Sequence, residues 1–418
     1  MLLAFLNALS GAGFMNEPLV YDPSNEAIRT NPFPFYEALQ ESDPVHWSPA
    51  IKSWIITRYD DVRQVAMSSN MSSDRLRPFY EALKDERRDI LSGVMRYLNE
   101  WLVFKAPPEH TRLRKMMNVV FSLQLVQSRE VAIQKTVEQL LEGVDPSREV
   151  DFVEKVAVLL PAYVILDMMG LPREDFAEIK QWSDDLRLFI GTSRTEEDKY
   201  KKARDGADRM SAYFRDVISQ RRSSPGDDVI TAMVTATDAN GALSEDELVA
   251  MCMLVLFGGH ETTTSLLGSA VVALIQHPEQ KQNLFENPSL IDSAVEEFLR
   301  YDGPSNSIAR VAAVDHELHG KKLMAGDRVF AMINAANRDP RRFDRPHELI
   351  LDRSPNRHLT FGQGLHFCLG APLARLEAKV CIGSLVAQYP AMRFGQGEVK
   401  WLDALVMRGP TQLPLVLS

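Results

Sequence analysis

The segment Phe361-Gly362-Gln363-Gly364-Leu365-His366-Phe367-Cys368-Leu369-Gly370 is the most informative stretch of this sequence. Its glycines permit a tight, irregular backbone that leaves N–H groups free near the Cys368 thiol. Directly after it, Ala371-Pro372-Leu373-Ala374-Arg375 begins a predicted helix. A thiol at a helix N-terminus tends to have a lowered pKa and accepts backbone hydrogen bonds. We therefore expect Cys368 to be a thiolate ligand of a metal ion.

Three other interpretations of this loop are weaker. A structural zinc site needs four ligands, and His366 with Cys368 supplies two at most. A phosphate-binding loop would continue with Gly-Lys-Ser/Thr, which does not follow here. A cysteine nucleophile needs a positioned histidine base, and His366 is too close in sequence to be assigned that role with ease.

The bulk composition narrows the class of protein. The chain has 418 residues, 45% of them hydrophobic, and a net charge of −10. Such an acidic chain argues against nucleic-acid binding. It contains three cysteines, and a small, odd number of cysteines does not suit a disulfide framework. This indicates a reducing, cytoplasmic setting. Cys252 and Cys381 lie in apolar runs and are expected to be buried.

The domain organisation is predicted to be simple. The apolar stretch Met1–Phe14 is shorter than the roughly 20 residues of a membrane span, and it lacks a basic signal-peptide segment. We therefore expect no membrane insertion. We expect 1–14 to be a disordered or loosely packed extension and 15–418 to form a single domain, without repeats or a flexible linker.

Helical periodicity dominates the chain, and strand patterns cluster in two places. Helices are expected over 128–141, 176–188 and 197–221. Strands are expected over 45–47 and 53–57 near the N-terminus, and over 316–320 and 327–332 in the C-terminal half, with a turn at 319–322. The predicted fold class is mainly α with small β sheets.

A long helix is predicted in the middle of the sequence. Ser244 and Glu247 form a capping box at its start, and His277-Pro278 ends it. The run Gly258-Gly259-His260-Glu261-Thr262-Thr263-Thr264 then breaks the helical pattern, because glycine and β-branched residues disfavour helix and a buried carboxylate is costly. Two interpretations remain open here: a ligand pocket in which Glu261 and Thr262 relay protons, or a kinked structural helix.

A second helix is predicted from Asn287-Pro288 to Tyr301, and it carries Glu297 and Arg300 on one face. A surface ion pair is the simpler interpretation of these two residues. A buried scaffold pair would need a third partner, for which Arg353 is the candidate.

Taken in order, these segments resemble the cytochrome P450 superfamily, and its bacterial class in particular. The Cys368 loop has the form Phe-Gly-x-Gly-x-His-x-Cys-x-Gly, the 258–263 run matches the oxygen-binding helix, and Glu297-x-x-Arg300 matches the scaffold pair. The first glycine of the helix motif, Gly258, stands where alanine is commoner. The resemblance covers nearly the whole chain and implies a triangular helical fold with haem b between the long helix and the cysteine loop.

The resemblance also implies roles for individual residues. Cys368 would be the axial ligand of the haem iron, Thr262 and Glu261 would be catalytic, and Glu297, Arg300 and Arg353 would be structural. The implied haem-binding residues are His110, Arg114, Arg310, His366, Phe361, Gly362, Gly370, Ala374, Gly258 and Gly259. The implied substrate-pocket residues are Leu254, Phe257, Ser305, Asn306, Ile308 and Val406, with further contributions from 91–102 and 186–190.

The implied activity is that of a monomeric monooxygenase that inserts one atom of O₂ into a lipophilic small molecule. Its electrons would come from NAD(P)H through a ferredoxin and a ferredoxin reductase, docked near Arg112, Lys115 and Arg375. Two alternatives are a peroxide-driven peroxygenase, against which the Glu261-Thr262 pair argues, and a non-catalytic haem-binding recruitment module, against which Cys368 argues.

Overall fold

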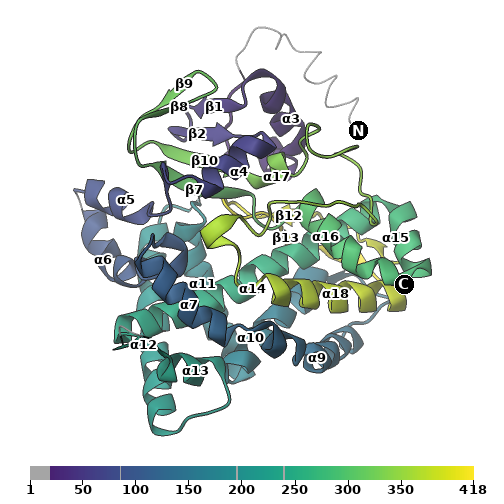
Figure 1. The fold of residues 1–418 in the computed structure, drawn as a ribbon. Coiled ribbons are helices and arrows are strands. Elements are labelled where there is room, and N and C mark those ends of the chain that lie inside the picture. Colours follow the sequence, from purple (N-terminus) through teal and green to yellow (C-terminus); the bar gives the residue numbers. More distant parts are fainter. Residues whose placement is uncertain (1–18, 85, 194–195, 239–240) are drawn as a thin grey trace.

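The computed structural model describes residues 19–84, 86–193, 196–238 and 241–418. The predicted N-terminal extension, 1–14, lies outside these residues. Figure 1 shows the described chain as a large group of helices with a small sheet gathered at one end. The prediction of a mainly α fold with small sheets is confirmed.

The central element is the long helix α14 (Glu245–Gln276), which runs through the middle of the helical group (Figure 1). Its capping box is present, because Ser244 Oγ accepts from Glu247 N and the Glu247 carboxylate accepts from Ser244 N. The helix is buried along most of its length and packs against α10 (Leu159–Met169), α12 (Lys199–Ser223) and α18 (Ala371–Gln388). It therefore forms the centre of the largest hydrophobic core.

The remaining helices surround α14 or cover the sheet. The longer ones are α3 (Phe33–Ser42), α4 (Tyr59–Met67), α6 (Glu86–Leu98), α7 (Glu109–Val120), α9 (Glu130–Glu142), α11 (Phe176–Ile190), α15 (Pro278–Glu286) and α16 (Ile291–Tyr301). The shorter ones are α2 (Glu26–Thr30), α5 (Leu76–Ala82), α8 (Leu123–Gln127), α13 (Val229–Thr235) and α17 (Ile333–Ala336). The helix predicted from Asn287 begins instead with a 3-10 turn, Pro288–Leu290, before α16.

The main sheet has five strands in the order β1-β2-β10-β7-β3. Its strands are β1 (Val45–Ser48), β2 (Ser53–Ile56), β3 (Met71–Ser72), β7 (Ser307–Ala312) and β10 (Arg328–Met332). Strand β10 pairs in parallel with β2 and antiparallel with β7, with Arg310 opposite Val329. The sheet thus joins the two strand-forming parts of the sequence and holds β7 at the edge of the helical group.

Short strands make up one three-stranded sheet, in the order β11-β14-β4, and three two-stranded sheets, β12-β13, β5-β6 and β8-β9. Their bounds are β4 (Val150–Asp151), β5 (Thr237–Asp238), β6 (Gly241–Ala242), β8 (His316–Leu318), β9 (Lys321–Leu323), β11 (Arg393–Phe394), β12 (Lys400–Trp401), β13 (Pro410–Gln412) and β14 (Pro414–Val416). The predicted turn at 319–322 is wrong in its extent. His319 and Gly320 alone turn the chain, both with positive φ, while Lys321 and Lys322 pair with β8. A two-residue turn with positive φ matches the twist of a hairpin, so the strands close directly behind it.

None of the helices in the described part of the chain is both long enough and apolar enough to span a bilayer.

Candidate functional site

An interior cavity of about 420 Å³ lies between α14 and the Cys368 loop, and its surface is mostly apolar. Most of the residues predicted for the site line it: His110, Arg114, Leu254, Phe257, Gly258, Gly259, Thr262, Ser305, Ile308, Arg310, Phe361, Gly362, His366, Cys368, Gly370, Ala374 and Val406. Segments more than 250 residues apart in the sequence therefore meet around one space.

The Cys368 loop forms one wall of this cavity. Gly362 and Gly364 adopt φ of 73° and 66°, a region that residues with a Cβ avoid. The loop is closed by the hydrogen bond from Cys368 N to Phe361 O, 2.8 Å long. The side chain of Cys368 is exposed, and it borders the cavity. The loop thus presents one thiol to the enclosed space.

The pKa predicted for this thiol is wrong in direction. Cys368 has accessible surface toward the cavity, yet many protein atoms surround its sulfur, and the resulting desolvation of the thiolate raises the pKa of Cys368. Backbone N–H groups of Gly370 and Ala371 and the charges of Arg114 and Arg375 act in the opposite sense. The loop does direct helix N-terminal N–H groups at the sulfur, as the sequence indicated. Their effect is smaller than the desolvation of the thiolate.

Helix α14 forms the opposite wall. Gly258 is exposed there, and a Cβ built on it meets no atom within 4 Å, so the helix surface leaves open space at this residue. Thr262, one turn later, donates a hydrogen bond from Oγ1 to Gly258 O over 3.1 Å. This part of the helix can therefore accept a flat group lying close to its backbone.

The structure gives Gly259 a role in helix packing that the sequence did not predict. A Cβ on Gly259 would lie 2.8 Å from Ile165 Cγ1 of α10, so this glycine permits close packing of α10 on α14. Both glycines line the cavity, as predicted, but a Cβ would meet open space at Gly258 alone of the pair. The sequence could not separate the two, because neighbouring helical residues point about 100° apart and the partner helix was unknown.

Cationic and imidazole side chains gather at one edge of the cavity: Arg75, His110, Arg114, Arg310 and His366. Burial, followed by the charges of Arg310, His110 and Arg114, lowers the pKa of His366 to about 3, and burial lowers the pKa of Arg310 to about 10. Within the described ranges, no carboxylate forms an ion pair with any of these five residues. The edge therefore has a surplus of positive charge and hydrogen-bond donors.

One imidazole at this edge has no partner of its own. Both ring nitrogens of His110 are buried without a hydrogen-bond partner, and its ring lies 4.4 Å from that of His366. Buried polar groups in proteins are nearly always satisfied. An anionic group in the cavity would satisfy them, and carboxylates are the natural acceptors for arginine and histidine. The residues present therefore fit a flat prosthetic group with a carboxylate edge and a metal facing Cys368.

Glu261 of α14 does not line the cavity. Its side chain belongs to a buried cluster of charged residues that includes side chains from α11. Its carboxylate lies 3.2 Å from Arg187 Nε, 3.5 Å from Lys180 Nζ and 3.1 Å from His260 Nε2. Burial alone would raise the pKa of Glu261, but these three neighbours outweigh it and hold the pKa well below its ordinary value. The unfavourable free energy of burying this carboxylate is thus offset by Lys180 and Arg187 of α11. No local sequence pattern identified these two partners.

Asn306 is the predicted pocket residue that the structure places elsewhere. Its amide accepts from Tyr36 Oη over 3.1 Å and donates to Leu405 O over 3.1 Å, so these two residues hold the side chain outside the lining of the cavity. The predicted stretches 91–102 and 186–190 also contribute fewer residues to the cavity than expected. Of 91–102, only Trp101 and Leu102 reach the cavity, and of 186–190, only Ile190 does, because their other apolar residues pack in the core.

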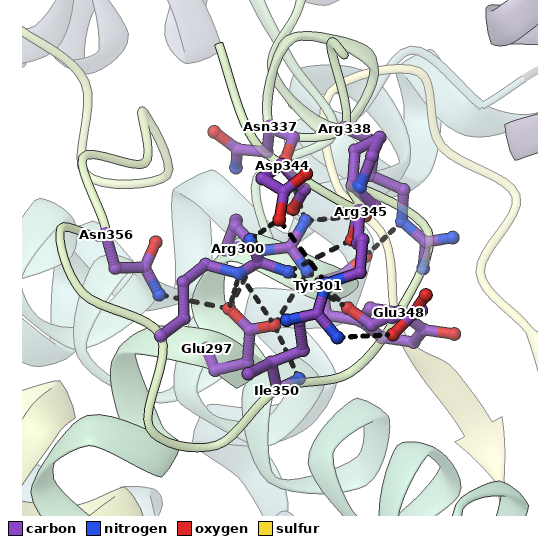
Figure 2. A network of polar contacts seen from close by, with 12 residues as sticks. Glu297, Arg300, Tyr301, Asn337, Arg338, Asp344, Arg345, Glu348, Ile350 and Asn356 are labelled. Atoms are coloured by element: carbon purple, nitrogen blue, oxygen red, sulfur yellow. Dashed lines mark hydrogen bonds and ion pairs between the residues drawn. The ribbon is translucent and has the colours of Figure 1, made fainter.

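The Glu297–Arg300 pair is completely buried, which decides between the two interpretations of these residues. Arg300 donates two hydrogen bonds of 2.7 Å to the Glu297 carboxylate (Figure 2). Its remaining N–H groups reach the carbonyls of Asn337, Pro346 and Glu348. Figure 2 also shows the Ile350 N–H and the Asn356 amide at the Glu297 carboxylate.

Arg353 completes this network, as the sequence suggested for a third partner. Its Nε lies 3.1 Å from Glu297 Oε2, and its NH1 donates to Asp344 O. The network fastens α16 to the irregular segment 337–356, which leads into the Cys368 loop.

Fold and site together define a helical protein that encloses an apolar cavity between a single thiol and a long helix, with a cationic edge. Comparison with known proteins names the class: the family model for cytochrome P450 matches residues 55–393. The chain belongs to the cytochrome P450 family, and it is a monooxygenase of that family, whose members use haem and O₂.

The relatives are bacterial. The chain is 33% identical to "Polyketide biosynthesis cytochrome P450 PksS" of Bacillus subtilis (strain 168), over 96% of this chain and 100% of the relative. It is 36% identical to "Vitamin D(3) 25-hydroxylase" of Pseudonocardia autotrophica, over 93% and 94%. The solved structure of PksS has a TM-score of 0.86 at 32% identity and covers 96% of this chain and 100% of its own. That of P450BioI with a hexadec-9Z-enoic acid ligated acyl carrier protein has a TM-score of 0.85 at 31% identity, covering 94% and 99%.

Proposed function

We propose that this protein holds haem b in the cavity, with Cys368 as the axial ligand of the iron, and inserts one atom of O₂ into a lipophilic small molecule. One observation carries the proposal: the Cys368 thiol and the open helix surface at Gly258 lie on opposite walls of a mostly apolar cavity. The arginines at one edge of this cavity form no ion pair with a described carboxylate. A thiolate ligand favours cleavage of the O–O bond, which suits this chemistry.

The haem would be held by three groups of residues. Arg114, Arg310, His110 and His366 would bind its two propionates, which is consistent with the unpartnered nitrogens of His110. Phe361, Gly362, Gly370 and Ala374 would contact the face on the Cys368 side, and Gly258 with its helix neighbours would contact the other face. All of these named residues line the cavity.

When bound, the haem supplies the redox chemistry that activates O₂ and transfers one of its atoms. The chain contributes proton handling and exclusion of water. Thr262 lines the cavity, and while its hydroxyl donates to Gly258 O its oxygen lone pairs can accept a hydrogen bond from a water or a protonated oxygen in the cavity. It could donate its own proton there only by releasing Gly258 O. Arg187, Lys180 and His260 hold Glu261 ionised, so it would accept a proton from solvent only when one of these ion pairs opens, and would release the proton when the pair forms again.

The substrate is proposed to be lipophilic because the cavity lining is mostly apolar, with Leu254, Phe257, Ile308 and Val406 among its residues. Two relatives are named for polyketide biosynthesis and for vitamin D(3) hydroxylation, both concerned with lipophilic molecules.

The electrons are proposed to come from NAD(P)H through a ferredoxin reductase and a ferredoxin that docks on the Cys368 side. Exposed Leu365 and Phe367 mark this face. Two of the three cations expected there are engaged in ion pairs: Arg112 with Glu247 at 2.6 Å and Arg375 with Glu296 at 2.6 Å. Docking would therefore depend on Lys115 and on partial release of these pairs.

The test of the proposal is the absorption of the reduced, carbon-monoxide-treated protein. We expect the red-shifted band of a thiolate complex in the wild type, its loss in Cys368→Ala, and its retention in Cys252→Ala, which removes a buried cysteine far from the loop in sequence. A wild type without the band, or a Cys368→Ala variant that keeps it, would overturn the assignment.

A further inference from the structure

Arg75 is a cationic residue of the cavity for which the sequence gave no sign. It lies between β3 and α5, in the segment Ser73-Asp74-Arg75-Leu76-Arg77, whose polar character is typical of a surface loop. Its side chain nevertheless lines the cavity. Its NH2 donates to Ile190 O over 3.1 Å, and its guanidinium carbon lies 5.2 Å from the centre of the Phe104 ring.

No anion accompanies this charge in the part of the chain that the structure describes. The adjacent carboxylate, Asp74, pairs with Arg77 instead. Desolvation by the surrounding protein, followed by the charge of the neighbouring Arg310, lowers the pKa of Arg75 to about 10. A half-buried cation without a counterion at a cavity is a candidate ligand-binding group.

The contacts of Arg75 connect the cationic edge with apolar residues of the cavity. Ile190 ends α11, and Phe104 closes the short turn Leu102–Phe104, and both residues line the cavity. The four other residues of the cationic edge, Arg114, Arg310, His110 and His366, already provide two arginines and two imidazoles for two propionates. Among the described residues, Ile190 O is the one hydrogen-bond acceptor of Arg75, so most of its five N–H donors remain for a ligand.

We propose that Arg75 is a specificity-determining residue that binds the carboxylate of an amphipathic substrate, whose lipophilic body occupies the apolar part of the cavity. This inference rests on the proposed function and narrows its substrate class from lipophilic molecules to lipophilic acids. An arginine suits this task because its planar fork can bind both carboxylate oxygens at once.

The test compares acids with alcohols of the same skeleton. The probes are dodecanoic acid and 1-dodecanol, lithocholic acid and its C24 alcohol, and abietic acid and its alcohol. Dissociation constants are measured on the haem-loaded protein by equilibrium dialysis, which needs no spectral change. In at least one pair, we expect the acid to bind tenfold or more tightly than the alcohol, the size typical of a hydrogen bond to a charged group.

The variants assign that preference to one residue. In Arg75→Gln we expect the acid preference to fall below twofold, with the affinity for the alcohol unchanged within twofold, and in Arg75→Lys we expect part of it to remain. Arg77→Gln is the matched control, since Arg77 is an exposed arginine of the same segment and should leave the preference intact. An absence of acid preference in all three pairs, or its persistence in Arg75→Gln, overturns the inference.

A second measurement separates substrate binding from haem binding. The rate of haem transfer to apomyoglobin should be unchanged in Arg75→Gln and increased in Arg114→Gln. Transfer from Arg75→Gln that is as fast as from Arg114→Gln would show that Arg75 holds a propionate, and would also overturn the inference. A protein without the thiolate absorption band fails the proposed function itself, whereas one that has the band but no acid preference fails this inference alone.

Discussion

Replacing Arg300 by leucine tests whether the buried network of Glu297 holds the fold together. Arg300 and Glu297 have no exposed side-chain surface, so water cannot replace the lost partner. The Arg300→Leu substitution removes two hydrogen bonds to the Glu297 carboxylate and leaves the carbonyls of Asn337, Pro346 and Glu348 with one donor fewer.

The expected magnitude follows from these losses. Removing one partner of a buried ion pair costs about 3–5 kcal/mol, because the remaining charge is left uncompensated. Here Arg353 Nε, 3.1 Å from Glu297 Oε2, continues to neutralise the carboxylate and limits that cost. The three carbonyls each lose a charged donor, which adds to it. We therefore expect the free energy of unfolding to fall by about 4 kcal/mol.

The assay is urea denaturation followed by far-ultraviolet circular dichroism. The control is Arg222→Leu, which removes an ion pair with Glu245 whose side chains are 49% and 42% exposed, and should cost at most about 1 kcal/mol. A double-mutant cycle of Arg300→Leu with Glu297→Leu measures the coupling, because the double variant leaves no unpaired glutamate. The reasoning is refuted if Arg300→Leu unfolds within about 1 kcal/mol of the wild type, or if the cycle shows no coupling.

The remaining predictions concern the cavity and its partners. Gly259→Ala should lower the free energy of unfolding by about 1–3 kcal/mol through overlap with Ile165, whereas Gly258→Ala should leave it equal or raise it by about 1 kcal/mol; equal effects in urea denaturation would contradict the assigned packing. Thr262→Ala should keep NAD(P)H consumption but divert it to hydrogen peroxide, and a peroxide assay that finds undiminished coupling of NAD(P)H to product would exclude the proton role of this hydroxyl. Turnover with an acidic ferredoxin should slow as ionic strength rises from about 0.05 to 0.5 M, because salt screens the docking charges, and a salt-independent rate would contradict electrostatic docking.

Local sequence patterns were enough to predict several elements. The capping box at Ser244 and the proline after His277 place the ends of α14 within one residue, because both signals act within a single helical turn. The turn of the hairpin at 316–323 is two residues shorter than predicted. In such short elements, the sequence pattern does not define where a strand ends and a turn begins to within one or two residues.

The sequence by itself determined the family, the Cys368 loop and the long helix, since each depends on residues that are close together in the chain. The tertiary structure alone decided the partners of side chains across long separations: Glu261 with Arg187, Asn306 with Tyr36, and Arg75 with Ile190, which are 115 residues apart. It also separated Gly258 from Gly259, because an added Cβ would meet open space at the first and Ile165 of a neighbouring helix at the second. The physical reason is that burial and ion pairing depend on what packs opposite a residue, and no pattern within one segment contains that information.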